Sequence, residues 1–225
     1  MKLKYFSHSA FQITSNGGTT LLIDPFLDDN PTSPVKSDDV DADFIILTHA
    51  HGDHIGDAFK IAKRCNSNFI CTYELANYCK AKGFKAHDMS IGGGHNFDFG
   101  RVKFTIAHHG SQTPEGDYAG EPAGVIVTID NTSIYHTGDT GLFYDMKLIG
   151  EMNNIDYMLL PIGDNYTMGI SDAVKAVELV QPKIAVPMHY NTFPVIETDP
   201  YQFKKELEVK GMNCLIMNFG DEIQI

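Results

Sequence analysis

FIILTHAHGDH, residues 44–54, joins an uninterrupted apolar run to a dense group of polar side chains. The apolar residues 44–47 do not alternate with polar ones, which is typical of a strand buried on both faces. His49, His51, Asp53 and His54 follow directly. These positions cannot all point one way from a helix or a strand, but an irregular loop can arrange them around a small volume. The segment therefore predicts a buried strand that ends in a binding loop.

Potential ligands also follow other apolar stretches. His108 and His109 come after residues 104–107, Asp139 after residues 134–137, and His189 after residues 184–186. Loops at one edge of a sheet, held by rigid strands, commonly carry binding groups. We therefore expect these side chains to meet at one edge of the fold. Imidazole with carboxylate suits zinc, manganese, iron, cobalt or nickel, whereas calcium prefers oxygen ligands alone.

The order of the predicted elements indicates the fold class. Apolar and β-prone stretches predict strands at residues 5–14, 20–23, 44–47, 69–72, 97–107, 125–129, 133–135, 157–160, 184–186 and 214–219. Helices are predicted at residues 57–64, 74–82, 172–180 with Ser171 as N-cap, and 200–210 with Asp199 as N-cap. Each half runs from a β-meander to alternating strands and helices. This predicts an α/β (α+β) fold, a four-layer αββα sandwich of two mixed sheets flanked by helices.

Composition excludes several classes of protein. Residues 1–225 contain no stretch typical of a linker, so we expect a single domain. The net charge of −12 argues against a nucleic-acid backbone or an anionic membrane as a partner. No signal peptide or membrane-spanning run is evident, so a cytoplasmic location is expected. The four cysteines lack CxxC spacing, which predicts free thiols. The sequence does not decide between a monomer and a homo-oligomer.

Several motifs together carry a family resemblance. THAHGDH, residues 48–54, resembles the HxHxDH signature of the metallo-β-lactamase superfamily, whose fold is the αββα sandwich. AHHGS (107–111), HTGDTG (136–141) and PMHYNTFP (187–194) agree with it in the expected order. HSAF (8–11), LIDPF (22–26) and PIGDNYTMG (161–169) resemble a subfamily of small metal-dependent hydrolases related to the L-ascorbate-6-phosphate lactonases. The resemblance covers nearly the whole chain.

The resemblance implies a dinuclear metal site. It assigns the first ion to His49, His51 and His109, the second to Asp53, His54 and His189, and places Asp139 between them. His108 competes with His109 for the first ion. In similar proteins the ligand is the histidine just before a short Ser, Gly or Trp position, which favours His109 and leaves His108 as a neighbouring or packing residue.

The implied chemistry is hydrolysis with two divalent ions, zinc or manganese in the first place and nickel, cobalt or iron as alternatives. A hydroxide bridging two ions can attack a small ester, lactone or phosphoester without a nucleophilic side chain. Two cations, two aspartates and that hydroxide sum to a charge of roughly +1, so a small anionic substrate is expected. Asp53, beside the nucleophile, is the candidate catalytic proton shuttle.

A further set of residues is expected to contact the substrate or to support the ligands. It consists of His8, Asp24, Asn165, Tyr190 and Asn191. Asp24 would accept the second N–H of a metal-bound histidine; its alternative role is to cap a turn before Pro25. His8 would face the pocket from within a strand, or be a buried histidine bonded to backbone. For the other three residues the alternative is shaping a turn.

Two other functions compete with hydrolysis. One is a mononuclear iron enzyme that oxidises thiols or persulfides with oxygen, which occurs elsewhere in the superfamily; oxygen consumption and a coloured protein would favour it. The other is a metal-binding sensor or scaffold without catalysis. Every expected ligand position is filled, which counts against loss of activity.

Overall fold

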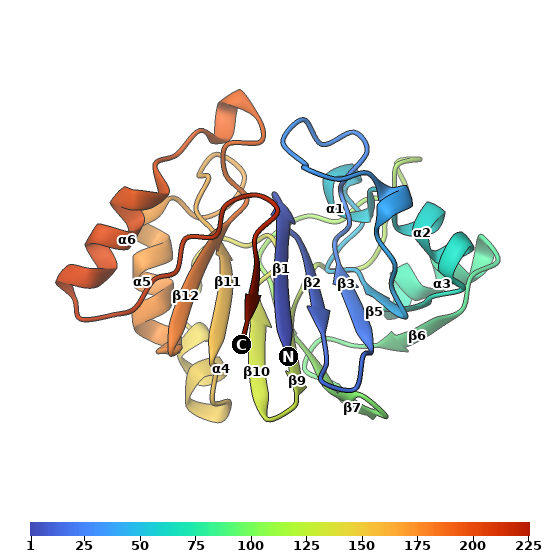
Figure 1. The fold of residues 1–225 in the computed structure, drawn as a ribbon, viewed down its shortest axis with the longest axis horizontal. Helices are drawn as coiled ribbons and strands as arrows, with labels where there is room; N and C mark the ends of the chain where they lie inside the picture. The colour runs from blue at the N-terminus through green and yellow to red at the C-terminus, as the bar shows by residue number, and fades with distance from the viewer.

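The computed structural model describes residues 1–225 as two mixed sheets packed face to face (Figure 1). The first sheet has the order β13-β1-β2-β3-β4-β5-β6. Its strands are β1 Lys2–Ser7, β2 Ala10–Thr14, β3 Thr20–Ile23, β4 Phe44–Ile46, β5 Asn68–Thr72, β6 Ala86–Met89 and β13 Glu222–Gln224. The strands from β3 to β6 are parallel. In β4, Ile46 packs between the sheets and Ile45 against the helices, which confirms a strand buried on both faces.

The second sheet has the order β12-β11-β10-β9-β8-β7. Its strands are β7 Gly94–Phe97, β8 Gly100–Ile106, β9 Ala123–Ile129, β10 Thr132–His136, β11 Tyr157–Pro161 and β12 Ile184–Met188. Strands β10, β11 and β12 are parallel, whereas β9 and β10 form an antiparallel hairpin. Asp130 and Asn131 turn this hairpin with φ values of 51° and 65°. Both residues tolerate the left-handed region, so the predicted hairpin is confirmed.

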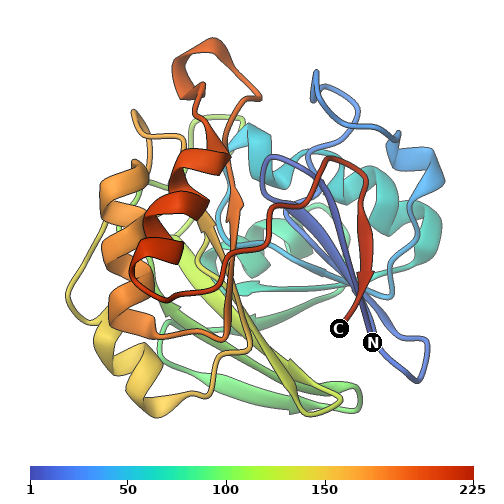
Figure 2. The same cartoon turned by 60° about the vertical axis from the view of Figure 1, so that its left-hand side comes forward.

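Helices cover the outer face of each sheet (Figures 1 and 2). The first sheet carries α1 Gly52–Ile55, α2 Ala58–Cys65 and α3 Tyr73–Ala81; the second carries α4 Met146–Met152, α5 Ile170–Val180 and α6 Pro200–Val209. Two short 3-10 helices, η1 Ser37–Asp39 and η2 Pro194–Ile196, lie in loops. One apolar cluster fills the space between the sheets, and two others lie beneath the helices. The predicted four-layer sandwich is confirmed.

The predicted strand at residues 214–219 is wrong. Only Cys214 pairs with β12, through an isolated bridge to Ala185, and the terminal strand β13 forms later on the other sheet. The segment between them crosses from one sheet to the other, so it has no constant neighbour to pair with. Its apolar residues instead contact the core between the sheets.

Two other expectations need local correction. Residues 5–14 form two strands, because the chain reverses at His8, which has a φ of 55°. His8 therefore lies in a turn and not within a strand. Helix α5 begins at Ile170 after Gly169, so Ser171 is inside the helix and does not cap it. The Asp199 cap of α6 is confirmed, since its carboxylate accepts the N–H of Tyr201.

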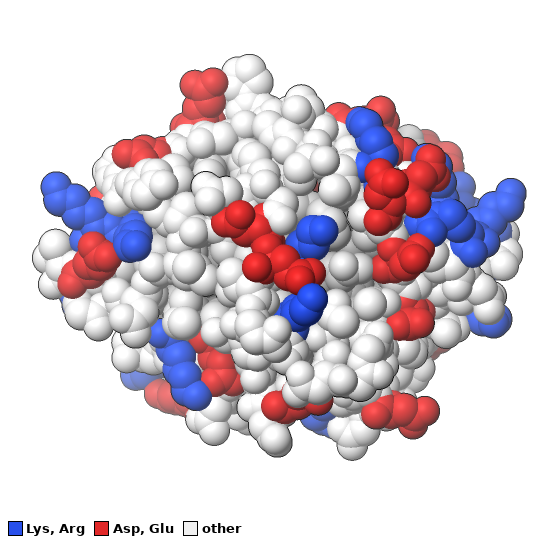
Figure 3. Space-filling model, viewed as in Figure 1, with Lys and Arg blue, Asp and Glu red and all other residues white.

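No helix is long and apolar enough to cross a bilayer. None of the four cysteines forms a disulfide, as expected. On the face shown in Figure 3, acidic and basic side chains are interspersed, with no continuous basic surface.

Candidate metal centre

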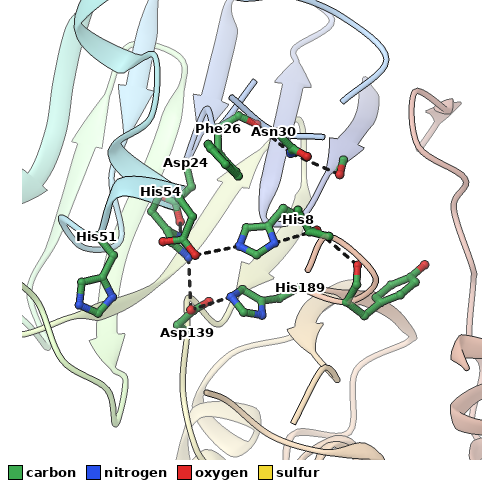
Figure 4. Close-up of polar contacts among 12 residues, drawn as sticks. His8, Asp24, Phe26, Asn30, His51, His54, Asp139 and His189 are labelled. Atoms are coloured by element: carbon green, nitrogen blue, oxygen red, sulfur yellow. Dashed lines mark hydrogen bonds and ion pairs between the residues drawn. The ribbon is translucent and has the colours of Figure 1, made fainter. Parts of the chain in front are cut away.

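The predicted ligands meet at one edge of the sandwich, where strands of both sheets end (Figure 4). Asp24 follows β3, His49 and His51 follow β4, His109 follows β8, Asp139 follows β10, and His189 follows β12. A cavity of about 370 Å³ opens above them. A larger groove, about 930 Å³, lies elsewhere and contains no histidine. The edge of the sandwich is therefore the candidate site.

The first group of donors consists of His49, His51 and His109. One ligand atom from each lies within 4.8 Å of the others. Nε2 of His49 is 3.0 Å from Nδ1 of His51. His51 stands at the N-terminal boundary of α1, where the chain turns out of the strand. Because His49 and His51 are two residues apart at the extended end of the strand, their side chains point to the same side.

The second group consists of Asp53, His54 and His189, within 4.8 Å of one another together with His8. Asp139 lies between the two groups. Its Oδ2 is 3.2 Å from Nε2 of His54, 3.0 Å from Nε2 of His189 and 3.7 Å from Nε2 of His109. The carboxylate of Asp139 therefore touches members of both groups. Gly138 makes this approach feasible, because its φ is +63° and a Cβ there would lie 2.6 Å from the Ala123 carbonyl oxygen.

Asp24 orients one histidine of each group. Its Oδ2 accepts a hydrogen bond from Nδ1 of His54 at 2.8 Å and from the Thr48 hydroxyl at 2.6 Å. The Thr48 oxygen in turn lies 3.0 Å from Nδ1 of His49. All four side chains are buried. Asp24 thus fixes the Nδ1–H tautomer of His54 directly and of His49 through Thr48, which leaves both Nε2 atoms available to a ligand.

His8 supports the second group from the β1–β2 turn. Its Nε2 lies 3.3 Å from Oδ2 of Asp53, and its Nδ1 lies 3.0 Å from the Thr192 hydroxyl. Both ring nitrogens are therefore occupied, so His8 acts as a hydrogen-bonding neighbour of Asp53. Burial lowers the pKa of His8 to about 4, with a further contribution from His189. A neutral His8 donates from Nε2 to the carboxylate.

The buried charges of the site compensate one another. Burial alone would lower the pKa of His54, but the carboxylates of Asp139 and Asp24 outweigh it and raise that pKa well above its usual value. Burial opposes ionisation of Asp139, yet His189 and His54 hold its pKa well below the usual range. Burial lowers the pKa of His49. The site therefore favours ionised carboxylates, which are the form that binds cations.

The donor set fits divalent transition-metal ions. Nδ1 of His189 and Oδ1 of Asp139 are buried without a hydrogen-bond partner. Nε2 of His54 is also buried and makes no hydrogen bond, although it lies 3.2 Å from Oδ2 of Asp139. Such atoms are costly in a folded protein unless something binds them. Imidazole nitrogens with carboxylate oxygens are the ligands that zinc, manganese and iron share. One group offers three nitrogens, and the other offers nitrogens together with a carboxylate.

Several expected contacts lie elsewhere. His108 stacks on Phe143, with ring centroids 4.9 Å apart, and does not join the donors. Tyr190 is buried in the core beneath the helices of the second sheet instead of lining the cavity. Asn191 shapes its own loop by accepting the N–H of Thr198. Asn165 is exposed with a φ of 46° and does not line the cavity.

Comparisons with known proteins agree with the geometry. A family model described as Beta-lactamase superfamily domain matches residues 19–190. A UPF0173 metal-dependent hydrolase from Bacillus thuringiensis subsp. konkukian is 50% identical over 232 aligned residues, covering 100% of both chains. This chain belongs to the UPF0173 family within the β-lactamase superfamily.

Solved structures extend the comparison. Igni18, a metallo hydrolase from the archaeon Ignicoccus hospitalis, superposes on this UPF0173 chain with a TM-score of 0.92 at 38% identity, covering 99% of this chain and 97% of the other. An isothiocyanate hydrolase from Delia radicum gut bacteria has a TM-score of 0.79 at 21% identity, covering 100% and 99%. The second likeness shows the shared fold alone.

Replacing Asp24 tests whether it orients both groups. Asp24→Asn replaces the carboxylate that accepts hydrogen bonds from His54 and Thr48 with an amide. We therefore expect the metal affinity of each donor group to fall by about 10- to 100-fold. Isothermal titration calorimetry with zinc measures this effect. Asp57→Asn is the matched control, because the Asp57 carboxylate accepts backbone N–H groups of Leu27 and Asp28 and touches no histidine of the site. Equal affinities for Asp24→Asn and the wild type would contradict the assignment.

Proposed function

We propose that this UPF0173 member hydrolyses a small ester, lactone or phosphoester with two divalent cations. One observation supports the proposal most strongly: the Asp139 carboxylate touches histidines of both donor groups. Zinc or manganese fits the donors, with nickel, cobalt and iron as alternatives. The relatives named metal-dependent or metallo hydrolases support the reaction class. The absence of a disulfide supports a cytoplasmic location.

The residues divide into holding and positioning roles. His49, His51 and His109 would hold one ion; Asp53, His54 and His189 would hold the other; Asp139 would contact both. When bound, the cations lower the pKa of a water molecule and polarise the substrate oxygen. Asp24 and Thr48 keep His49 and His54 in the tautomer that directs Nε2 inward. His8 holds the Asp53 carboxylate against the cavity.

Asp53 is the candidate for moving the proton. It lines the cavity, and its side chain is 31% exposed, whereas the side chain of Asp139 is only 3% exposed. A carboxylate that reaches both the buried site and the open cavity can accept a proton from water and return it to the departing oxygen. His8 donates a hydrogen bond to Oδ2 of Asp53 and so keeps this carboxylate at the edge of the cavity.

Metal analysis followed by a substrate panel tests the function. The purified protein is loaded with the metal found by elemental analysis and assayed on p-nitrophenyl esters, lactones, and p-nitrophenyl phosphate mono- and diesters. Metal-dependent release of product is expected from at least one class. Oxygen consumption with a persulfide, without any hydrolysis, would instead support the mononuclear iron enzyme that oxidises thiols or persulfides. Full metal loading without turnover of any substrate would support a binding protein.

Replacing Asp53 separates proton transfer from metal binding. Asp53→Asn is expected to lower kcat by about 10²-fold or more, because a positioned acid–base group contributes roughly 10²- to 10⁴-fold. Metal content is measured on the same samples, so that a loss of ions is distinguished from a loss of the proton carrier. If Asp53→Asn kept both metals and full turnover, the proton-shuttle role would be wrong.

A further inference from the structure

The cavity has a metal-binding floor and an apolar wall. Apart from five of the predicted ligands, it is lined by Tyr166, Phe193 and Val195. Tyr166 and Val195 are each 57% exposed. Phe193 packs edge-on against His8 and lies 6.3 Å, centroid to centroid, from Phe26. Three apolar or aromatic side chains thus line an otherwise polar site, and two of them, Tyr166 and Val195, are exposed to solvent.

The loop that presents Tyr166 turns through left-handed backbone. Asp164 and Asn165 have φ values of 59° and 46°, a region that Asp and Asn tolerate. Asp164 donates its N–H to the Met168 carbonyl at 3.0 Å, and Met168 donates its N–H to the Thr140 carbonyl, which fixes the loop to the Asp139 segment. Gly163 allows the loop to approach the site, since a Cβ there would lie 2.2 Å from the His189 carbonyl oxygen. The backbone thus holds an exposed tyrosine beside the donors.

The loop that presents Phe193 and Val195 is also held by internal hydrogen bonds. Asn191, with a φ of 57°, donates its N–H to the Ile196 carbonyl and accepts the Thr198 N–H on its side chain. Ile196 is fully buried and anchors the loop. Val195 therefore points outward from an ordered turn. Two independently braced loops expose apolar groups toward one cavity, which is the arrangement of a substrate-binding wall.

The same edge of the protein lacks basic side chains. All 17 lysines and arginines lie outside the segments that surround the site, residues 8–9, 24–35, 47–57, 107–122, 137–145, 162–169 and 189–199. These segments do contain acidic residues, among them Asp164 and Glu197. Proteins that select phosphate monoesters usually supply Arg or Lys for the phosphate oxygens. No lysine or arginine lines the cavity.

We propose that Tyr166, Phe193 and Val195 determine specificity, and that the substrate is a small uncharged ester or lactone with an apolar substituent. The inference rests on the proposed hydrolase function and narrows its substrate class. The apolar substituent lies against the wall, and the carbonyl lies over the donors. Negative charge then arises on the carbonyl oxygen only as the reaction proceeds, so binding is directed to the transition state. In this proposal an uncharged substrate replaces the small anionic substrate that the charge of the metal site predicts.

The reaction balances without a further reactant. The oxygen of water bonds to the carbonyl carbon, and the bond from that carbon to the alcohol oxygen breaks. The alcohol oxygen leaves with the electron pair and takes one proton of the water. The carboxylic acid formed releases its proton to solvent. The products are a carboxylate and an alcohol.

A binding series tests the wall without turnover. Acetate, butyrate and hexanoate carry the same charge and differ only in their tails. Titrated calorimetrically into the zinc-loaded protein, they are expected to bind about two- to fourfold more tightly with each methylene, because full burial of a methylene corresponds to about a fourfold change. Tyr166→Ala should flatten this dependence. Tyr201→Ala, which removes a similarly exposed tyrosine on α6, should leave the dependence unchanged. An affinity that does not depend on tail length would contradict the proposal that these three side chains bind an apolar substituent.

A matched activity series tests the preference for uncharged substrates. With the same leaving group, p-nitrophenyl butyrate should have a kcat/KM at least about tenfold above that of p-nitrophenyl phosphate. Val195→Lys adds the missing cation and should raise the phosphate-to-ester ratio by about fivefold, whereas Val209→Lys on α6 should leave it unchanged. A wild-type enzyme that prefers the phosphate would overturn the inference and leave hydrolysis intact. No turnover of these two substrates or of any other in the panel would overturn the proposed function, while the binding series would still test the contact between the tail and Tyr166.

Discussion

Chelation of metal is expected to abolish hydrolysis and to lower the Tm by about 10 °C. A ligand present at 1,000 times its Kd stabilises the folded state by about 4 kcal/mol. In a domain of this size each kcal/mol corresponds to roughly 2–4 °C. The effect is large here because four of the seven donors are buried and three of their polar atoms lack a hydrogen-bond partner. Differential scanning calorimetry before and after EDTA treatment measures it.

Metal re-addition is the control for chelation. Zinc or manganese should restore both the Tm and the activity, whereas calcium, which prefers oxygen ligands, should restore neither. If the Tm did not change when bound metal was removed, metal bound by the donor groups would not stabilise the folded protein.

Asp139→Asn is expected to lower kcat/KM by at least about 10³-fold. The substitution removes the negative charge that lies 3.0–3.7 Å from histidines of both groups. Electrostatic stabilisation by a metal site is worth several kcal/mol, and each 1.36 kcal/mol is a factor of ten in rate. Elemental analysis of Asp139→Asn should show fewer than two ions per chain. Steady-state kinetics on the best substrate of the panel measures the rate.

Asp156→Asn is the matched control for Asp139→Asn. Asp156 lies at the opposite end of the same sheet, where its carboxylate accepts the N–H of Ser133 and pairs with Lys183. It touches no donor of the site, so only a small change in stability is expected. Equal kinetics for Asp139→Asn and Asp156→Asn would exclude Asp139 from the centre.

Local sequence was sufficient where a residue's role depends on its position after a strand. The seven predicted metal ligands all follow β4, β8, β10 or β12, and parallel strands bring those ends to one edge. The same reasoning failed for residues 214–219, because an apolar stretch that crosses between sheets has the composition of a strand but no neighbour. It also placed His8 in a strand, since nothing local marks a left-handed histidine between two β-prone runs.

The surroundings of the ligands depend on loop shape and could not be predicted in detail. Tyr190 directly follows the predicted ligand His189, yet its side chain turns into the core, while Phe193 and Val195 reach the cavity. That difference comes from the left-handed backbone at His189 and Asn191. The link from Thr48 to His49 was missed as well. A hydroxyl one residue before the first histidine was its only signal.

The number of metal ions bound per chain tests the central claim most directly. Metal-free protein is titrated with zinc and with manganese, and the bound metal is counted by mass spectrometry after gel filtration. We expect two ions per chain in the wild type and no more than one when His49 and His51 are both replaced by alanine. A wild-type protein that retains no ion, or a doubly substituted protein that still retains two, would contradict the account.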